Sequence, residues 1–331
     1  IDATIILASG LEVLSARVHE SFVTTVSGYN KFVKWVRKNS CDMEESAWLF
    51  CGENTGDYSK PLCNYLYGRG YDVWLENAKC IKDASGLRRL KSDKADSAMI
   101  AEYAMRNYDR AELYIPLNES LSQLRELFLF RQMLVRQKHG FQVRRGEKNR
   151  TMEKSSVKTA ISQIGRHMVN ECNKQIEKVE RRIKDIIDGD EELKRTYELI
   201  TTIPGIGTQN AVCLLTFTNN FTRFGYNARK IACYYGIAPF GRDSGTSVHS
   251  DPHVHYMANR MLKSMLTQAA LASIRCCAPI AHYYHRLIAL GKKKQVALNN
   301  VKNKLIHIIT AMVKNNLSFN PGYTNINKFI A

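Results

Sequence analysis

An apolar repeat near the middle of the chain constrains the fold more than any other feature. Ile176, Val179, Ile183 and Ile186 recur at spacings of three, four and three residues. This spacing forms the seam of a coiled coil or helical hairpin, because it turns one apolar face toward a partner helix. A long helix is therefore expected here.

The first hundred residues show a different pattern, in which strand and helix signals alternate. Residues 1–7 form a β-branched run that stops at Ser9-Gly10, and residues 11–18 resume it, so the two runs predict a hairpin. The further expected elements are strands at 47–51 and 71–75 and helices at 29–38, 59–67 and 93–106. Hairpin strands followed by strand–helix alternation indicate an α/β domain with a mixed sheet.

The helical signals begin near Asn118, a plausible helix N-cap, and dominate again after Leu199. A chain of 331 residues exceeds one ordinary core, so several domains are expected. The predicted division is an α/β domain at 1–115, a helical connector at 116–195 and a mostly α-helical domain at 196–331.

The charge balance is strongly basic. Lys and Arg number 48 against 31 Asp and Glu, a formal net charge of +17 that attracts polyanions, nucleic acid first among them. Part of the excess falls in one stretch of the connector, namely Arg131, Arg136, Lys138, Arg144, Arg145, Lys148 and Arg150. Such a run is either a solvated helix face or a nucleic-acid contact. We favour the contact, with Arg144 and Arg145 as candidate binding residues.

Nine cysteines, an odd number without any C-x-x-C pair, indicate reduced thiols in a cytoplasmic protein rather than a disulfide or zinc framework. His249, His253 and His255 fit no zinc spacing. Neither an apolar run of membrane-spanning length nor a signal peptide is recognisable. We therefore expect a cytoplasmic protein without a membrane partner.

Three acids form the first candidate site. Glu53 follows a predicted buried strand in G-E-N-T-G-D-Y, whereas Asp93 and Asp96 lie three residues apart at the start of a predicted helix, on one face. Converging carboxylates suit Mg²⁺ or Mn²⁺, and such ions promote phosphoryl transfer. Each feature also has a simpler interpretation, a turn for Glu53 and a favourable helix dipole for the two Asp residues.

A glycine turn and a serine form the second candidate site. In T-I-P-G-I-G, the backbone amides of Gly205 and Gly207 can hold a DNA phosphate, as in helix-hairpin-helix motifs, or the segment is a tight structural turn. Ser244 lies in D-S-G-T-S, and no activating base is recognisable near it in the sequence. Residue types alone therefore leave Ser244 as an ordinary turn serine.

Taken together, these segments resemble the signatures of the DEDD transposases of bacterial insertion sequences, which include Piv-type invertases and bridge-RNA-guided recombinases. G-E-N-T-G-D-Y and K-S-D-K-A-D-S-A resemble the family's E-A-T-G-x-Y and K-T-D-x-x-D-A. Y-Y-G-I-A-P and D-S-G-T-S resemble its G-L-x-P and E-S-G-x-S, and G-K-K-K-Q-V-A resembles its G-K-x-x-x-x-A. The resemblance covers nearly the whole chain in the correct order.

The resemblance implies a fold and roles for individual residues. The first domain would be RNase H-like (RuvC-like), with Glu53, Asp93 and Asp96 as catalytic metal ligands. Ser244 would be the nucleophile that bonds to DNA, with Ser247 as a supporting serine. Nucleic-acid contacts are implied for Lys263, which replaces the family's Arg, and for Lys292, Lys293 and Lys294.

One family acid has no counterpart in the sequence. The family's first Asp lies in G-I-D-x-S-K and is followed by a second apolar-Asp pair, and I-D-A-T-I at Asp2 matches that second pair better. We therefore expect the first catalytic Asp upstream of Ile1.

The expected function is DNA strand cleavage and exchange by an insertion-sequence transposase through a covalent phosphoserine, with Mg²⁺ or Mn²⁺. The resemblance implies element and target DNA, a structured guide RNA and a homo-oligomer, dimer or tetramer, as partners in the bacterial cytoplasm at the nucleoid. In the family, acids of one subunit act with the serine of another. Two alternatives remain open, a metal-dependent junction-resolving nuclease and a non-catalytic nucleic-acid-binding relative.

Overall fold

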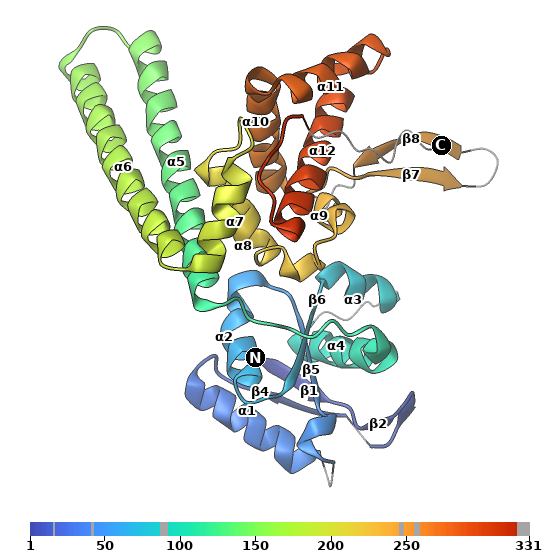
Figure 1. Ribbon diagram of the computed structural model, residues 1–331. Helices are drawn as coiled ribbons and strands as arrows, with labels where there is room; N and C mark the ends of the chain where they lie inside the picture. Colours follow the sequence, from blue (N-terminus) through green and yellow to red (C-terminus); the bar gives the residue numbers. More distant parts are fainter. Residues whose placement is uncertain (16, 41–42, 87–91, 245–247, 255–258, 323–331) are drawn as a thin grey trace, which may run out of the picture. The chain divides into compact units, whose positions relative to one another are not determined.

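A computed structural model of the chain describes residues 1–15, 17–40, 43–86, 92–244, 248–254 and 259–322 (Figure 1). The chain forms two compact units, Ile1–Pro116 and Leu117–Ala331. The second unit combines the predicted helical connector with the predicted C-terminal domain.

The first unit opens with the expected hairpin. Strand β1 (Asp2–Ile5) pairs antiparallel with β4 (Val18–Ser21), and the short strands β2 (Ala8–Ser9) and β3 (Glu12–Val13) close it. Gly10 makes the turn at a φ of +60°, a conformation that favours glycine. The hairpin prediction is confirmed, although the second long strand begins at Val18 instead of Leu11.

A parallel pair follows. Strand β5 (Leu49–Glu53) lies beside β6 (Asp72–Glu76), and helix α2 (Lys60–Tyr67) connects them, as a parallel crossover requires. The described strands of this unit form separate two-stranded sheets, in which β1 and β5 are not hydrogen-bonded to each other. Helix α4 (Asp93–Asn107) packs against both β1 and β5, and so joins the two pairs.

Helix α1 (Val26–Asn39) contributes three residues to this unit's core. The Thr25 side chain caps it by accepting a hydrogen bond from the Gly28 amide, and Phe32, Val33 and Val36, which share one face of the helix, are buried. The remaining short elements are η1 (Glu45–Ala47), η2 (Gly56–Tyr58), α3 (Ala78–Ala84) and η3 (Tyr108–Arg110).

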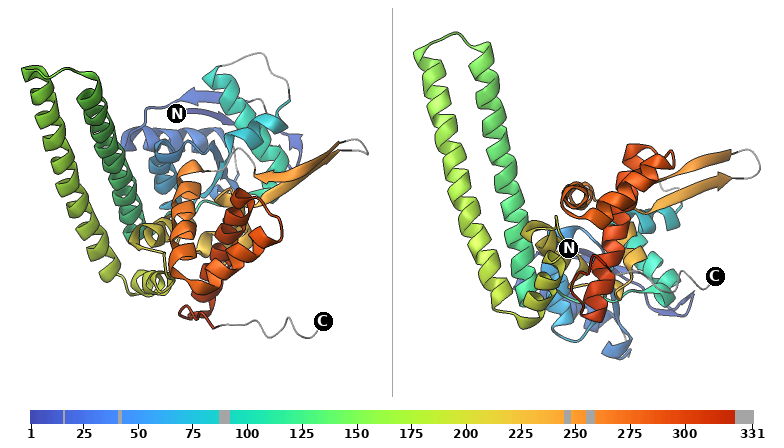
Figure 2. Two further views of the ribbon diagram at one scale, coloured as in Figure 1. Left: turned by 90° about the horizontal axis from the view of Figure 1, so that it is seen from above. Right: turned by 45° about the horizontal axis from the view of Figure 1, so that its top comes forward.

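Two long helices begin the second unit. Helices α5 (Glu119–Thr151) and α6 (Ser156–Asp188) pack along each other as a hairpin (Figure 2). Asn118 caps α5, because its side chain accepts a hydrogen bond from the Leu121 amide at 2.7 Å. The predicted seam is confirmed at Ile176, Val179 and Ile183, which are all buried, whereas Ile186 is half-buried and Ile187 is buried in its place.

The C-terminal helices share one hydrophobic core with the start of α5 and the end of α6. They are α7 (Glu191–Thr201), α8 (Thr208–Thr218), η4 (Thr222–Phe224), α9 (Ala228–Tyr234), α10 (Arg260–Cys276), α11 (Ala278–Ala289) and α12 (Lys294–Asn315). A hairpin of β7 (Pro239–Ser244) and β8 (Val248–Val254), which the sequence patterns did not predict, projects from them (Figure 2). Within the described residues, no helix has the length and apolar character needed to cross a membrane.

Candidate active-site and nucleic-acid-binding residues

Two carboxylate residues end the parallel strands of the first unit. Glu53 is the last residue of β5 and is exposed, and its partner in the β-sheet register is Glu76, the last residue of β6. The Glu76 carboxylate accepts hydrogen bonds from the Tyr103 hydroxyl at 3.1 Å and from the Asn77 amide at 2.6 Å. The sequence patterns missed Glu76, because only the strand register reveals that it lies beside Glu53.

Asp93 and Asp96 lie in the first turn of α4, as expected. Ser92 caps this helix by accepting a hydrogen bond from the Ala95 amide at 3.2 Å. Asp93 is exposed and Asp96 is half-buried. Both lie at the N-terminus of the helix, where the positive end of the helix dipole stabilises a negative charge. This position is therefore compatible with stabilisation of the helix and with binding of a metal ion.

The acids of this unit do not form a complete metal cage. Among the described residues, no three His, Cys, Asp or Glu side chains are grouped so that they could hold a metal ion. The oxygen chemistry of Glu53, Asp93 and Asp96 suits a hard divalent cation, but their arrangement in this structure does not bring all three together. The predicted three-acid convergence is therefore not seen.

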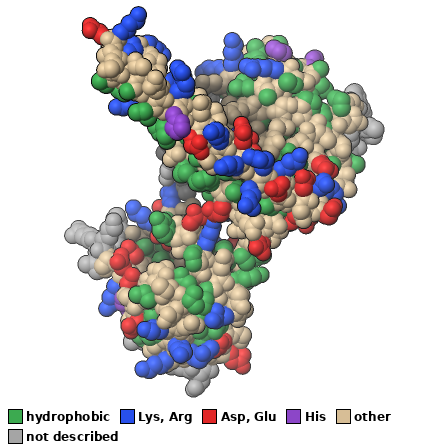
Figure 3. Space-filling model, turned by 90° about the vertical axis from the view of Figure 1, so that its left-hand side faces the viewer, with side chains coloured by type: hydrophobic (Ala, Val, Ile, Leu, Met, Phe, Trp, Pro, Cys, Tyr) green, Lys and Arg blue, Asp and Glu red, His purple; other side chains and the backbone are tan. Residues whose placement is uncertain are grey.

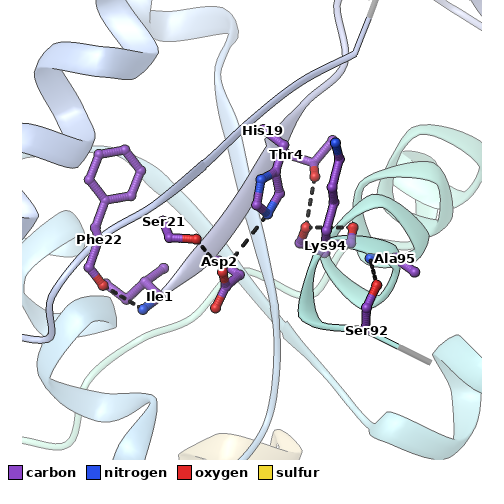
Figure 4. Close-up of polar contacts among 10 residues, drawn as sticks. Ile1, Asp2, Thr4, His19, Ser21, Phe22, Ser92, Lys94 and Ala95 are labelled. Carbon is purple, nitrogen blue, oxygen red and sulfur yellow. Dashed lines mark hydrogen bonds and ion pairs between the residues drawn. The ribbon is translucent and has the colours of Figure 1, made fainter.

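The Asp2 carboxylate of β1 contacts two side chains of β4 (Figure 4). The Ser21 hydroxyl donates a hydrogen bond to this carboxylate, and Nε2 of His19 lies 3.9 Å from the same oxygen. Nearby, the Thr4 hydroxyl of β1 and the Ser97 hydroxyl of α4 are hydrogen-bonded at 2.7 Å. This bond fixes the first two turns of α4, which carry Asp93 and Asp96, onto β1.

Two titratable groups near Glu76, the Tyr103 hydroxyl and the Cys51 thiol, have raised pKa values. Burial, and next the Glu76 carboxylate, raise the pKa of Tyr103 to about 12. Burial and Glu76 likewise raise the pKa of the Cys51 thiol to about 12. Tyr103 therefore remains a hydrogen-bond donor to Glu76 at neutral pH.

Ser244 is the last residue of β7. In the hairpin register Ser244 pairs with Val248, the first residue of β8. Ser247 and His255 lie outside the described residues, as do the side chains of Ser244, His249 and His253. The sequence predicted a turn serine here, and the backbone places it at a strand end.

The glycine turn between α7 and α8 has a packing role. Gly205 has a φ of +92°, and a Cβ at this position would lie 2.3 Å from the Ser273 nitrogen on α10. Only glycine allows this approach. Gly207 is exposed and is the N-cap of α8, with nothing within 4 Å of an added Cβ. Packing therefore explains Gly205, whereas the end of α8 at Gly207 is open to a ligand.

The basic residues of the connector differ in their availability. Arg131 is held internally, because its guanidinium contacts Glu180 of α6 at 2.7 Å. Arg144 is exposed, and the stem of Arg145 packs against Gly165 of α6. On the face of this unit shown in Figure 3, Lys and Arg side chains are widely spread with carboxylates among them. Arg144 is therefore freer than Arg131 to meet a phosphate.

Three lysines at the start of α12 are exposed. Gly291 turns the chain at a φ of +81°, and three exposed lysines follow it, Lys292, Lys293 and Lys294. Lys263 is half-buried on α10, one turn after Asn259, which caps that helix through the amides of Met261 and Leu262.

Comparisons with known proteins identify the class. Residues 197–286 match the family described as "Transposase IS116/IS110/IS902 family", and residues 1–145 match the DEDD transposase family of IS110 elements, described as "Transposase". These matches define a DNA transposase. The chain belongs to the IS110-type DEDD transposase family.

Curated relatives agree with this assignment. The pilin gene-inverting proteins of Moraxella bovis and Moraxella lacunata are each 23% identical over 303 residues, which cover 90% of this chain and 89% of theirs. An uncharacterized 43.6 kDa protein of insertion element IS110 from Streptomyces coelicolor is 33% identical over 116 residues, 35% of this chain and 28% of that protein. The chain is thus a DNA-binding transposase or recombinase of a family that uses a divalent metal.

Proposed function

We propose that this transposase cleaves and exchanges DNA strands through a covalent bond between DNA and Ser244, with Glu53, Asp93 and Asp96 as its metal-binding acids. The observation that carries the proposal is the order of the matched segments. The DEDD family model spans all three acids, and the second family model spans Ser244. A RuvC-like fold for the first unit is part of the proposal, and its parallel β5–β6 pair and antiparallel β1–β4 pair support it.

The proposed reaction conserves a phosphodiester bond at each step. The Ser244 oxygen attacks the phosphorus of a DNA phosphodiester as its proton passes to a base. The bond from phosphorus to one deoxyribose oxygen breaks, and that oxygen takes up a proton and leaves as a hydroxyl. Attack by the hydroxyl of another strand on the phosphoserine then forms the new DNA linkage and releases the serine, so ATP is not needed.

The proposal extends to the partners. Ser247 supports the nucleophile. The backbone amides of Gly205 and Gly207 contact nucleic acid, as do Arg144, Arg145 and Lys263. So do the three lysines at the start of α12, Lys292, Lys293 and Lys294. A structured RNA selects the DNA sites, and a dimer or tetramer in the bacterial cytoplasm, at the nucleoid, supplies the acids from one subunit and the serine from another. The exposure of Arg144 and of the three lysines supports a backbone-contacting role.

A covalent-adduct assay tests the central claim. The protein, element-end DNA, the RNA transcribed from the flanks of the element and Mg²⁺ are incubated, denatured and separated on a gel. We expect a slowly migrating protein–DNA species that is lost in Ser244→Ala and in Asp93→Ala. Ser250→Ala is the matched control, because Ser250 lies in β8 of the same hairpin, opposite Arg242, and should form the adduct normally.

The same gel separates the alternatives. If DNA is cleaved without adduct formation, and cleavage persists in Ser244→Ala, the protein is a nuclease that uses water as the nucleophile. DNA binding without cleavage by any variant would identify a non-catalytic relative. Either result would overturn the proposed role of Ser244.

A further inference from the structure

The net positive charge of the protein comes mainly from its C-terminal part, because carboxylate residues are scarce there. Residues 201–331 contain fifteen Lys and Arg residues but only two carboxylate residues, Asp243 and Asp251. Cations in this part of the chain therefore have few internal counter-charges. A lysine that is buried here needs either an unusual local partner or an anion from outside.

Lys302 is such a lysine. It lies in α12 and is 6% exposed, on the side of this helix that packs against α10. Its Nζ atom lies 3.4 Å from the Thr267 hydroxyl oxygen of α10, and the Thr267 hydroxyl itself donates to the Lys263 carbonyl at 2.7 Å. A long hydrogen bond to one hydroxyl leaves most of the bonding capacity of the ammonium group unused.

The second cation beside this group is Lys263. Lys263 lies one turn before Thr267 on α10, and the Thr267 hydroxyl contacts both the Lys263 carbonyl and the Lys302 ammonium group. Burial, and next the charge of Lys263, lower the pKa of Lys302. Within the part of the chain that the structure describes, neither lysine forms a salt bridge. Two neighbouring cations without a carboxylate are an unfavourable arrangement unless an anion joins them.

We propose that Lys302, Lys263 and Thr267 form a phosphate-binding site on the α10–α12 face, which holds one backbone phosphate of the DNA. The two ammonium groups supply charge, and the Thr267 hydroxyl fixes the position of Lys302. Thr267 and Lys263 are both partly exposed, so the site opens to the surface of α10. A phosphate is favoured over a carboxylate ligand because its several charged oxygens can bond both lysines at once.

The inference rests on the DNA-binding role of the chain and adds Lys302 to the residues that serve it. Lys302 differs from the exposed lysines at the start of α12, because its position is fixed by packing. An exposed lysine strengthens binding mainly through the general field, whereas a fixed pair holds one phosphate in a defined place. Lys302 therefore sets the register of the DNA backbone along α10.

Lys302→Met tests the site, because methionine keeps the length and packing of the side chain and removes the charge. Lys304→Met is the matched control, since Lys304 lies on the same helix and is exposed, with its Nζ atom 5.0 Å from the centroid of the Tyr283 ring. Affinity for a short DNA duplex is measured by fluorescence anisotropy over a range of salt concentrations. A plot of log affinity against log salt concentration has a negative slope whose magnitude grows with the number of phosphate contacts. For Lys302→Met we expect this magnitude to decrease by about the value of one contact, and for Lys304→Met by less.

A second arm distinguishes the source of the phosphate. Thermal unfolding of the full chain is followed in inorganic phosphate and in chloride at matched ionic strength. We expect phosphate to raise the melting temperature of the wild type and of Lys304→Met more than that of Lys302→Met. A phosphate effect that disappears in Lys302→Met while DNA binding stays unchanged would assign the site to free phosphate and overturn the DNA-backbone role.

The remaining outcomes are also decisive. Equal DNA-binding losses in the two variants would mean that only the general field acts, which overturns the site. Ser244-dependent adduct formation is scored separately in the same preparations. DNA binding that depends on Lys302 without an adduct would remove the proposed serine chemistry and leave the phosphate site standing.

Discussion

Asn299 of α12 donates a hydrogen bond from Nδ2 to the backbone carbonyl of Ile237 at 2.8 Å. Ile237 is fully buried and lies two residues before β7. The bond therefore ties the base of the hairpin that carries Ser244 to a rigid helix of the core. A nucleophile must be held close to its reaction geometry, so the loss of such a tie is expected to affect the reaction more than the fold.

Asn299→Ala is predicted to slow formation of the Ser244–DNA adduct several-fold, while the free energy of unfolding falls by about 1 kcal/mol, the usual value of one hydrogen bond. Asn300→Ala is the control, because the Asn300 side chain donates to the Val296 carbonyl of its own helix, at 3.0 Å, and so does not tie the helix to the hairpin. The adduct rate and a denaturant titration are measured for both variants. Equal rates in the two would show that the Asn299 tie does not position the serine.

Gly205→Ala is predicted to destabilise the protein by about 2 kcal/mol or more, because the added Cβ would overlap the α10 backbone at Ser273 and the φ of +92° is strained for alanine. Gly207→Ala is the comparison, since its Cβ would meet nothing within 4 Å. We expect Gly207→Ala to unfold nearly like the wild type. Chemical denaturation measures both, and equal stabilities would contradict the packing role of Gly205.

The sequence predicted the elements that local patterns encode. The Ile176–Val179–Ile183 seam is buried because heptad spacing alone places those residues on one helix face. The cap at Asn118 follows from side-chain chemistry within a few residues. Such features depend on neighbours in the sequence, so the sequence is sufficient to find them.

Features that depend on long-range packing were missed. The β7–β8 hairpin has Pro239 at its start and Pro252 within its second strand, and proline is a weak strand former. Glu76 becomes relevant only through the register that pairs it with Glu53. Lys302 becomes notable only when α10 is packed against α12. The sequence therefore predicts only those candidate residues that lie within short motifs, and Glu76 and Lys302 do not.

Metal removal is predicted to stop strand cleavage, because this family uses a divalent cation. Chelation with EDTA should abolish the adduct, and added Mg²⁺ or Mn²⁺ should restore it. Asp93→Asn and Glu53→Gln should fail to recover at metal concentrations that fully restore the wild type. Asp109→Asn is the control, because Asp109 is exposed and its carboxylate lies 3.9 Å from Nε of Arg110. Full activity of Asp93→Asn would remove this residue from the proposed ligands.

Three thiols are predicted to resist alkylation at pH 8. Burial raises the pKa of Cys51 and Cys213 to about 12 and that of Cys63 to about 11. The reactive form of a thiol is the thiolate, so these side chains remain protonated and unreactive until the pH approaches those values. Exposed Cys233 and Cys276 should be labelled first. Mass spectrometry after brief iodoacetamide treatment of the folded protein gives the order, and early labelling of Cys213 would contradict its burial.

The titration of Lys302 gives a prediction about stability that does not depend on any ligand. Its pKa in the folded protein is lowered below the ordinary value of 10.5, first by burial and then by Lys263. Below the folded-state pKa, the lysine is protonated in both states, and burial of the charge costs stability. Between that pKa and 10.5, the folded protein releases the proton while the unfolded chain keeps it, so this group makes stability rise with pH.

Lys302→Met removes this contribution. In chloride buffer, the difference in unfolding free energy between Lys302→Met and the wild type should therefore be largest below the folded-state pKa and should shrink as the pH rises toward 10.5. Lys304→Met corrects for the general titration of exposed lysines, because Lys304 is exposed on the same helix. Denaturant titrations at several pH values measure the differences. A gap that stays constant across this range would mean that Lys302 is not held as a charged, buried group, and a bound phosphate would have no unpaired cation to satisfy there.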